Sequence, residues 1–329
     1  MVLRWRRSPI LTISISPLLA IVGPTASGKS ALALRLAQRF NGEIVNCDSL
    51  QVYRGMDIGT SKPSLAEREN LPHHLFDARN PDQVFNAGEY AQIARGVLSD
   101  IAARGGLPVV VGGAGFYLKA MLEGLFPGPG RSMATRARLE RIASRYPGGL
   151  HRILACWDVA SAERIHPNDV NKIIRALEVM VTEGQPLSLA HKRLRGKLEG
   201  FSSLKIGLHP NRAELRERIA VRTRRMFADG LIEELRGLRD AGYGPEAKAM
   251  EAVGYRQANA LLNQQLSIEQ AIAETSTRTA QYAKRQMTWF RRDAEVVWLE
   301  GFGDDSSVQD QAESVLKHFL VKVTNSSPK

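Results

Sequence analysis

Cysteine is almost absent from this sequence. Only Cys47 and Cys156 occur among 329 residues, too few for a disulfide framework or a cysteine-rich zinc site. No window of about eighteen residues is continuously apolar, which argues against a membrane-spanning helix. We therefore expect a cytoplasmic protein in a reducing compartment.

The N-terminus has three arginines before an apolar stretch, a pattern that imitates a signal or transit peptide. The apolar stretch leads directly into a glycine-rich loop. We therefore interpret residues 18–22 as a core strand and residues 1–15 as a dispensable extension. An organellar presequence cut before about Ser14 is the alternative.

The chain is basic, with 45 Lys and Arg against 34 Asp and Glu, a net charge of +11. Such an excess suggests a polyanionic partner, although an ordinary basic surface is the alternative. The length and the 43% of hydrophobic residues are sufficient for a sizeable core and for two domains, or one domain with a large insertion.

The clearest motif is GPTASGKS, between an apolar strand and a helical pattern rich in Leu and Ala. Its residues are Gly23, Pro24, Thr25, Ala26, Ser27, Gly28, Lys29 and Ser30. The glycines let successive amides point into one cavity, the helix N-terminus adds its positive end, Lys29 supplies a charge and Ser30 can reach Mg²⁺. This phosphate loop (residues 23–30) is predicted to bind a diphosphate or a triphosphate.

A second short strand, with Ile44 and Val45, is followed by Asp48. In a doubly wound sheet we expect this strand beside the first one, with Asp48 at the edge where ligands bind. A carboxylate there can accept a proton or orient a metal ion, whereas capping of the turn with Ser49 is the alternative. The polar, glycine-broken stretch that follows favours a substrate loop.

A third apolar strand ends in Gly112, Gly113 and Gly115 and not in Asp. The missing carboxylate argues against an energy-transducing ATPase and favours a small kinase or a transferase. The glycines either let a ligand approach the backbone or form a tight strand-to-helix turn.

Most of the positive charge lies between Arg131 and Lys205, where 14 Lys and Arg stand against 7 Asp and Glu. We expect a phosphate-loop α/β domain, nucleotide-kinase-like with a largely parallel sheet, at residues 1–130 and 203–329. Residues 131–202 would be a basic helical insertion with few aromatics that contacts nucleic-acid phosphates, or simply a solvated charged face. Residues 303–329 are expected to form a short helix and a frayed tail.

Six blocks resemble, in order and spacing, the bacterial tRNA dimethylallyltransferase family, also called tRNA isopentenyltransferases. They are GPTASGKS, CDSLQVYRGMDIGTSKP, VVGGAGFYLKAMLEG, RIHPNDVNKIIRALEV, VGYRQ and TAQYAKRQMTWFRRD. The resemblance covers residues 18 to about 299. The resemblance implies transfer of the dimethylallyl group of dimethylallyl diphosphate to the exocyclic amine of the adenine 3′ of the anticodon, in tRNAs that read codons starting with U. We expect Mg²⁺ as the cofactor, the tRNA anticodon stem-loop as the partner and an enzyme that is a monomer.

The resemblance assigns roles to individual residues. Asp48 matches the general base, Lys29 and Mg²⁺ at Ser30 would neutralise the leaving diphosphate, and Arg222 matches an arginine that reaches it. The adenine must be turned out of its stack. The implied tRNA contacts are Asp48, Ser49, Leu50, Gln51, Arg136, Asn171, Lys172, Ile173, Ile174, Arg175, Gly254, Tyr255 and Arg256. Without the resemblance, Arg222 and Arg256 would be interpreted as exposed helical arginines.

One position departs from the family pattern. Ala114 stands where the family usually has Thr, whose hydroxyl helps to orient the adenine amine. Loss of one such hydrogen bond costs about 1 to 3 kcal/mol, roughly 10 to 100-fold in rate, unless Ser49 or a water compensates. Lys172 stands where Arg is common, a milder change for a phosphate contact.

Three other functions remain open from the sequence. A small-molecule or nucleotide kinase with a basic lid would share the loop and Asp48, and ATP-dependent phosphoryl transfer would reveal it. A prenyltransferase acting on free adenine nucleotides would make little use of the basic insertion. A non-catalytic RNA-binding module would follow if Ala114 marks decay of the site, although the phosphate loop, Asp48 and Arg222 are all present.

Overall fold

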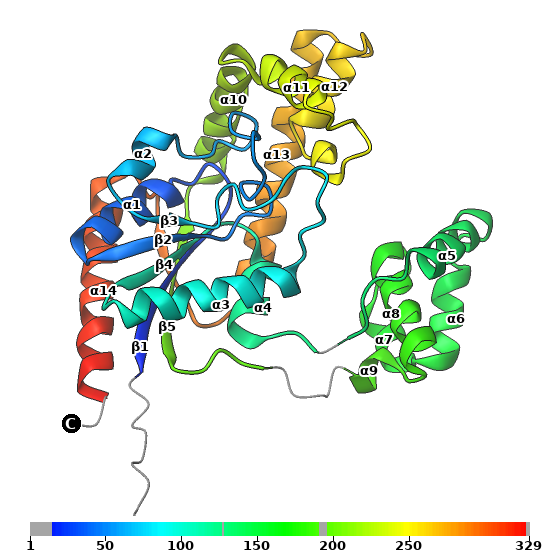
Figure 1. Ribbon diagram of the computed structural model, residues 1–329, viewed down its shortest axis with the longest axis horizontal. Helices are drawn as coiled ribbons and strands as arrows, with labels where there is room; N and C mark the ends of the chain where they lie inside the picture. Colours follow the sequence, from blue (N-terminus) through cyan, green and yellow to red (C-terminus); the bar gives the residue numbers. More distant parts are fainter. Residues whose placement is uncertain (1–14, 127, 191–195, 327–329) are drawn as a thin grey trace, which may run out of the picture. The chain divides into compact units, whose positions relative to one another are not determined.

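The computed structural model describes residues 15–126, 128–190 and 196–326; the expected extension at residues 1–14 lies outside them. The chain forms two compact units (Figure 1). The sheet unit combines the described parts of Met1–Leu122 and Leu198–Lys329, and the helical unit is Glu123–Lys197. These limits differ from the expected 131 and 202, because residues 123–130 join the helical unit and β5 already begins at Phe201.

The sheet has six parallel strands in the order β3-β2-β4-β1-β5-β6. They are β1 (Ser16–Val22), β2 (Gly42–Asn46), β3 (His73–His74), β4 (Leu107–Val111), β5 (Phe201–His209) and β6 (Val296–Glu300). This confirms the predicted α/β fold with a parallel core.

The neighbour expected for the first strand is wrong. β4 separates β1 from β2, with Val109 paired to Leu19 on one side and to Ile44 on the other. Every residue of β4 is buried, as a continuous apolar strand requires in the middle of a parallel sheet. Asp48 therefore lies two strands away from the phosphate loop along the sheet edge.

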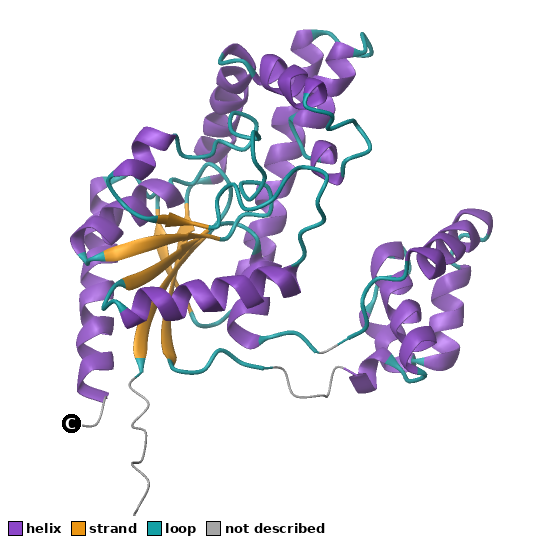
Figure 2. Cartoon of the chain, viewed as in Figure 1, coloured by secondary structure: helices purple, strands orange, loops and turns teal. Residues whose placement is uncertain are grey.

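Helices pack on both faces of the sheet (Figure 2). The helices of the sheet unit are α1 (Lys29–Arg39), α2 (Leu65–Glu69), α3 (Ala87–Ala103), α4 (Gly115–Glu123), α10 (Arg212–Ala228), α11 (Leu231–Asp240), η1 (Lys248–Glu251), α12 (Tyr255–Leu262), α13 (Ile268–Phe290) and α14 (Ser306–Ser326). Leu19 and Ile21 of β1 pack with Leu32 of α1 and Leu316 of α14 in the main core. The phosphate loop thus starts from one of the most deeply buried strands.

The C-terminal segment differs from the expectation of a short helix and a frayed tail. α14 has 21 residues, and Val308, Ala312 and Leu316 recur every four positions and are buried against the sheet. The buried Glu313 accepts from Arg35 of α1 at 2.9 Å and pairs with Arg39 at 3.0 Å. This helix is therefore part of the core.

The helical unit has a core of its own. Its helices are α5 (Met133–Arg145), α6 (Gly149–Trp157), α7 (Val159–Arg164), α8 (Val170–Glu183) and α9 (Leu187–Ala190). Leu150 and Leu154 of α6 pack with Ile173, Ile174 and Leu177 of α8. Nowhere in the described residues is there a helix long and apolar enough to cross a membrane.

Candidate active site

The predicted catalytic groups meet at one edge of the sheet. The phosphate loop follows β1, Asp48 follows β2, Ala114 follows β4, and α10, which carries Arg222, follows β5. The carboxyl ends of parallel strands share one edge, where α/β proteins bind their ligands. The topology therefore brings together four groups that are far apart in sequence.

The phosphate loop adopts an unusual backbone conformation. Gly23, Ala26 and Gly28 have positive φ angles of 140°, 64° and 82°, a region that costs a residue with a side chain about 1 kcal/mol or more. The carbonyl of Gly28 accepts from the amide of Leu32 at 3.1 Å, which opens α1. The loop thus ends at a helix N-terminus, as an anion site requires.

Lys29 and Arg222 bring positive charge to this loop. The Lys29 ammonium donates to the carbonyl of Pro24 at 2.6 Å, and the Arg222 guanidinium donates to Thr25 Oγ1 at 2.8 Å. Burial lowers the pKa of Lys29 to about 8, while the charge of Asp48 raises it and that of Arg222 lowers it. Burial also lowers the pKa of Arg222, and Asp48 opposes this shift. Two cations and one carboxylate therefore share one electrostatic environment.

Asp48 also has a structural role in its turn. Its Oδ1 accepts from the amides of Leu50 at 2.8 Å and Gln51 at 3.4 Å. The turn-capping alternative is therefore correct for this one oxygen. The bonds orient the carboxylate while its charge acts on Lys29 and Arg222.

The glycines after β4 serve packing inside the protein. A Cβ added at Gly112 would lie 2.0 Å from the carbonyl oxygen of Cys47, and one at Gly115 would lie 2.1 Å from Trp289. A Cβ at Gly113 would lie 1.9 Å from Nε2 of Gln286. β4 ends at Val111 and α4 begins at Gly115, so the connection is a tight turn, and its glycines make room for these neighbouring protein groups. Between these glycines, the half-buried Ala114 donates its amide to the Cys47 carbonyl at 3.1 Å.

Gln286 is a site residue that the sequence reasoning missed. Its Oε1 accepts from the amide of Thr25 at 2.7 Å, and its Nε2 donates to the carbonyl of Gly113 at 3.1 Å. One buried side chain on α13 thus joins the phosphate loop to the turn after β4. On the same helix, Tyr282 has its pKa raised by burial and by the charge of Asp48. The only sequence signal was the position of both residues in one of the six blocks.

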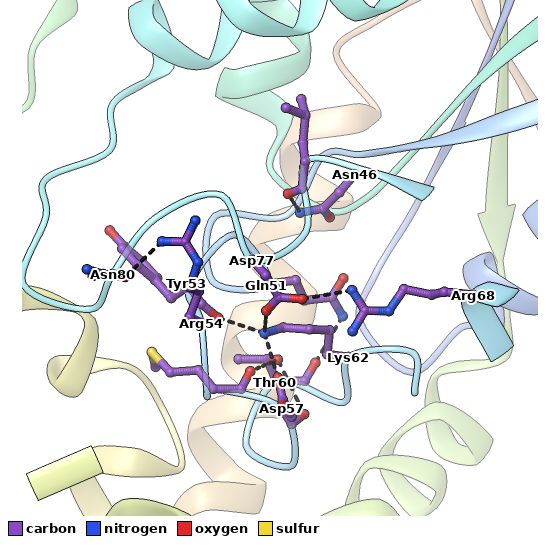
Figure 3. Close-up of polar contacts among 12 residues, drawn as sticks. Asn46, Gln51, Tyr53, Arg54, Asp57, Thr60, Lys62, Arg68, Asp77 and Asn80 are labelled. Carbon is purple, nitrogen blue, oxygen red and sulfur yellow. Dashed lines mark hydrogen bonds and ion pairs between the residues drawn. The ribbon is translucent and has the colours of Figure 1, made fainter. Parts of the chain in front are cut away.

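A buried lysine organises the substrate loop (residues 49–62), as Figure 3 shows. The Lys62 ammonium donates to the carbonyl of Tyr53, to Asp57 and to Asp77, each at 2.6 Å. Arg68 donates to the other oxygen of Asp77 at 2.8 Å. All three protons of the ammonium therefore have acceptors.

Gln51, an expected tRNA contact, forms hydrogen bonds within the same loop. Its side-chain amide donates to the carbonyls of Thr60 at 3.1 Å and Ser61 at 3.2 Å. Both Nε2 protons thus stabilise the loop, and Oε1 is the remaining polar atom of this side chain.

Helices α11 and α12 hold the substrate loop from the other side. The Glu234 carboxylate accepts from the amides of residues 57, 58 and 59 at 2.8, 2.7 and 3.1 Å, and from the Tyr255 hydroxyl at 2.6 Å. Tyr255 is fully buried and Gly254 is buried, whereas Arg256 is exposed. Of these three expected tRNA contacts, only Arg256 presents its side chain to solvent.

The expected contacts in the helical unit divide in the same way. Asn171 and Lys172 are exposed, but Ile173 and Ile174 are each 1% exposed and lie in the core of the unit. Arg175 donates to the buried Glu178 at 2.8 Å and to the carbonyl of Pro129. Arg136 lies 3.6 Å from the same carboxylate. Of the stretch 171–175, Asn171 and Lys172 are therefore the residues most accessible to RNA.

Comparisons with known proteins give the chain relatives over nearly its whole length. The sequence profile of the IPP transferase family matches residues 51–293. A tRNA dimethylallyltransferase of Koribacter versatilis is 51% identical over 301 residues, 91% of this chain and 98% of the relative. One of Solibacter usitatus is 49% identical over 304 residues, 92% of this chain and 99% of the relative.

Solved structures show the same likeness. The crystal structure of a tRNA isopentenylpyrophosphate transferase from Bacillus halodurans matches with a TM-score of 0.69 at 35% identity and covers 94% of this chain and 97% of its own. A eukaryotic dimethylallyltransferase acting on tRNA matches with a TM-score of 0.78 at 28% identity, over 93% of this chain and 80% of its own.

Proposed function

The chain belongs to the IPP transferase family and is an enzyme that prenylates tRNA, and from this premise we propose how its site performs the transfer. The donor is dimethylallyl diphosphate, and the acceptor is the exocyclic amine of the adenine 3′ of the anticodon. One observation carries the proposal: the phosphate loop, Arg222 and Asp48 meet at one sheet edge and act on one another electrostatically.

The donor half of the site is the phosphate loop. Its amides and the positive end of α1 receive the diphosphate, while Lys29 and Arg222 neutralise the charge that grows on it as the bond to the allylic carbon breaks. The contact from Arg222 to Thr25 Oγ1 holds the guanidinium at the loop before the donor arrives. The two cations therefore need little rearrangement to act on the leaving group.

The acceptor half is Asp48. The adenine nitrogen attacks the allylic carbon, the bond from that carbon to the diphosphate oxygen breaks, and Asp48 accepts the proton that the nitrogen loses. The amides of Leu50 and Gln51 hold Oδ1, so the carboxylate needs little reorganisation when the base arrives. Exposed Arg256 would contact the RNA phosphates near the displaced nucleotide.

Mg²⁺ belongs to this proposal as the cofactor. Ser30 is exposed at the first turn of α1 and would offer its hydroxyl as one oxygen ligand, with the diphosphate as the main ligand. Within the described residues, no group of three or more His, Cys, Asp or Glu side chains could hold a metal ion. The ion would bind together with the diphosphate, where it would neutralise charge on the leaving group.

The kinase alternative is not favoured, since the named relatives are tRNA dimethylallyltransferases. The helical unit, with 13 Lys and Arg against 7 Asp and Glu between residues 123 and 197, supplies the positive surface that a tRNA backbone needs. We further propose that a single copy of the chain, in the cytoplasm, carries out the reaction.

The experiment that tests this function follows label from dimethylallyl diphosphate into unmodified tRNA in the presence of Mg²⁺. Label should enter the RNA with the wild-type chain at the adenine 3′ of the anticodon. The variant Asp48→Asn, which keeps an acceptor at Oδ1 but loses the base, should slow transfer at least about 100-fold and still bind donor. Equal transfer by Asp48→Asn would refute the assignment of the base, and absence of label with wild type would refute the activity.

A further inference from the structure

The segment that follows β6 packs against the phosphate loop. In residues 301–305, the amide of Gly303 donates to the carbonyl of Ser27 at 2.9 Å. The approach is close on both sides: a Cβ on Gly303 would lie 2.4 Å from the Gly28 carbonyl oxygen, and one on Gly28 would lie 2.7 Å from Oδ1 of Asp304. Neither glycine tolerates a side chain at this contact.

This contact sets the direction of a phosphate-binding amide. In a trans peptide the C=O and the following N–H point in opposite directions. The bond that holds the Ser27 carbonyl against Gly303 therefore turns the Gly28 amide away from the 301–305 segment and toward the anion site. The segment thus acts on the face of the loop that the diphosphate does not occupy.

The same segment supports the strained residue of the loop. Ala26, with a φ of 64°, packs against a small cluster that contains Phe302 of the segment and Leu215 and Ile219 of α10. A residue stays in such a conformation only when its surroundings hold it there. The phenyl ring of Phe302 therefore helps to keep the loop in shape.

An ion pair fastens the segment to α10. The Arg218 guanidinium lies 3.6 Å from the centre of the Phe302 ring and donates to both oxygens of Asp304, at 2.7 and 2.8 Å. Arg218 lies one helical turn before Arg222, which bonds to Thr25 of the loop. α10 therefore holds the phosphate loop twice, directly through Arg222 and through the 301–305 segment by Arg218.

We propose that Arg218 and Asp304 are positioning residues, which keep the phosphate loop in its diphosphate-binding conformation without touching the diphosphate. This deepens the proposed function and rests on it for the identity of the donor. Their side chains are 40% and 47% exposed, so the pair contributes little to global stability. Its effect is expected in donor binding and not in folding.

The test measures binding of magnesium pyrophosphate to the full-length chain by calorimetry. Asp304→Asn keeps the size of the side chain but removes its charge, and it should raise the Kd at least about threefold. The matched control is Asp229→Asn, which breaks the exposed pair that Asp229, the residue after α10, makes with Arg225 of that helix at 3.3 Å, and it should leave the Kd unchanged. An unchanged Kd for Asp304→Asn would refute the proposal.

The sign of the change separates positioning from simple repulsion. If Asp304 only repelled the anion, its neutralisation would tighten pyrophosphate binding, and that result would overturn the proposal. If Arg218 itself bound the diphosphate, Arg218→Gln would still weaken binding in the Asp304→Asn background. Positioning predicts instead that the double variant binds about as weakly as either single one, and that Arg218→Lys restores part of the affinity.

Transfer kinetics and thermal unfolding complete the test. Asp304→Asn should raise the KM for the prenyl donor, leave the KM for tRNA and the kcat at saturating donor close to wild type, and keep the Tm within about 2 °C. A decrease in Tm with equal increases in both KM values would show a merely structural role.

Pyrophosphate binding needs no transfer, so a wild-type chain that binds it but labels no tRNA would refute the function and leave this inference standing. A wild-type chain that does not bind it would refute the inference.

Discussion

At the scale of the single residue, Lys29 couples donor binding to pH. Its pKa is lowered to about 8 from 10.5 because it is buried, whereas a bound diphosphate favours the charged ammonium. Below pH 8 the lysine is already protonated. Above it, binding must take up a proton, and the affinity for magnesium pyrophosphate should fall up to about tenfold per pH unit. Calorimetry between pH 7 and 10 measures this, and an affinity that stays level to pH 10 would contradict it.

Lys29 makes the free energy of unfolding change with pH in the opposite direction to donor affinity. Since the folded pKa lies below the unfolded value, the unfolded chain binds more protons between about pH 8 and 10.5, and this contribution to the free energy of unfolding rises with pH. Lys29→Met should remove both the pH dependence of pyrophosphate affinity and this pH dependence of the free energy of unfolding. The burial that weakens the folded state at neutral pH is thus what places the charge beside the phosphates.

Ala114 offers a second prediction at this scale. Ala114→Thr would introduce the hydroxyl that the family resemblance leads us to expect here, at a half-buried position whose amide bond to Cys47 the substitution leaves intact. We expect kcat to rise about tenfold with the KM for the donor unchanged. Single-turnover transfer measures the change. If Thr has no effect, another hydroxyl already orients the adenine amine, and Ser49→Ala and Tyr282→Phe would show which one.

How far the sequence predicts single residues depends on how their chemistry is encoded. Lys29 belongs to the phosphate-loop motif and Asp48 follows a short apolar strand, and both patterns indicate a chemical role. The structure brings the two residues to one sheet edge. Gln286 has no such spacing, because its two bonds join segments that lie 261 and 173 positions away. Such a role becomes visible only when the fold brings the segments together.

At the scale of the element, the substrate loop depends on Lys62. Replacement by Met would leave Asp57 without its ion-pair partner and Asp77 with Arg68 alone. We expect the free energy of unfolding to fall by about 1 to 3 kcal/mol, measured by urea denaturation, because the carbonyl of Tyr53 loses its donor while both carboxylates stay partly exposed. Transfer should also show a raised KM for tRNA, while pyrophosphate binding stays near wild type because the phosphate loop makes none of these contacts.

Lys62→Arg provides the control for that prediction. It keeps the charge but needs more room than the buried site offers, and it should recover part of the stability. A Lys62→Met protein with wild-type stability and tRNA affinity would show that the bonds of Gln51 and Glu234 are sufficient to hold the loop.

Helices and strands can be predicted from the sequence where their apolar residues follow one clear pattern. The strands before the phosphate loop and before Asp48 were found from their apolar runs, but the position of β4 between them was not, since strand order depends on pairing between distant segments. α14 could have been found, because Val308, Ala312 and Leu316 follow a four-residue spacing. Its polar residues, however, are also typical of a frayed tail.

At the scale of the whole molecule, the charge distribution predicts how the enzyme holds RNA. The basic segment was visible in composition alone, although which of its residues face solvent was not: Ile173 and Ile174 are packed in the core, while Arg138, Arg141 and Arg145 form an exposed row on α5. The position of a residue around its helix decides whether its side chain faces solvent. That position can be predicted from the sequence only once the limits of the helix are known.

Neutralising that row should weaken tRNA binding in a salt-dependent way. Removal of each phosphate contact reduces the slope of log K against log salt by about 0.7 to 0.9, so Arg138→Gln with Arg141→Gln and Arg145→Gln should lower it by about 2 to 3. Filter binding of unmodified tRNA at several salt concentrations measures the slope. Lys317→Gln removes an exposed cation on α14; it is the control and should leave the slope unchanged.

Because the row lies outside the sheet unit that holds Lys29 and Asp48, kcat at saturating tRNA should stay at the wild-type value. A triple variant with an unchanged slope would exclude this row from the RNA interface, whereas a lowered kcat would mean that the helical unit also acts on the chemical step.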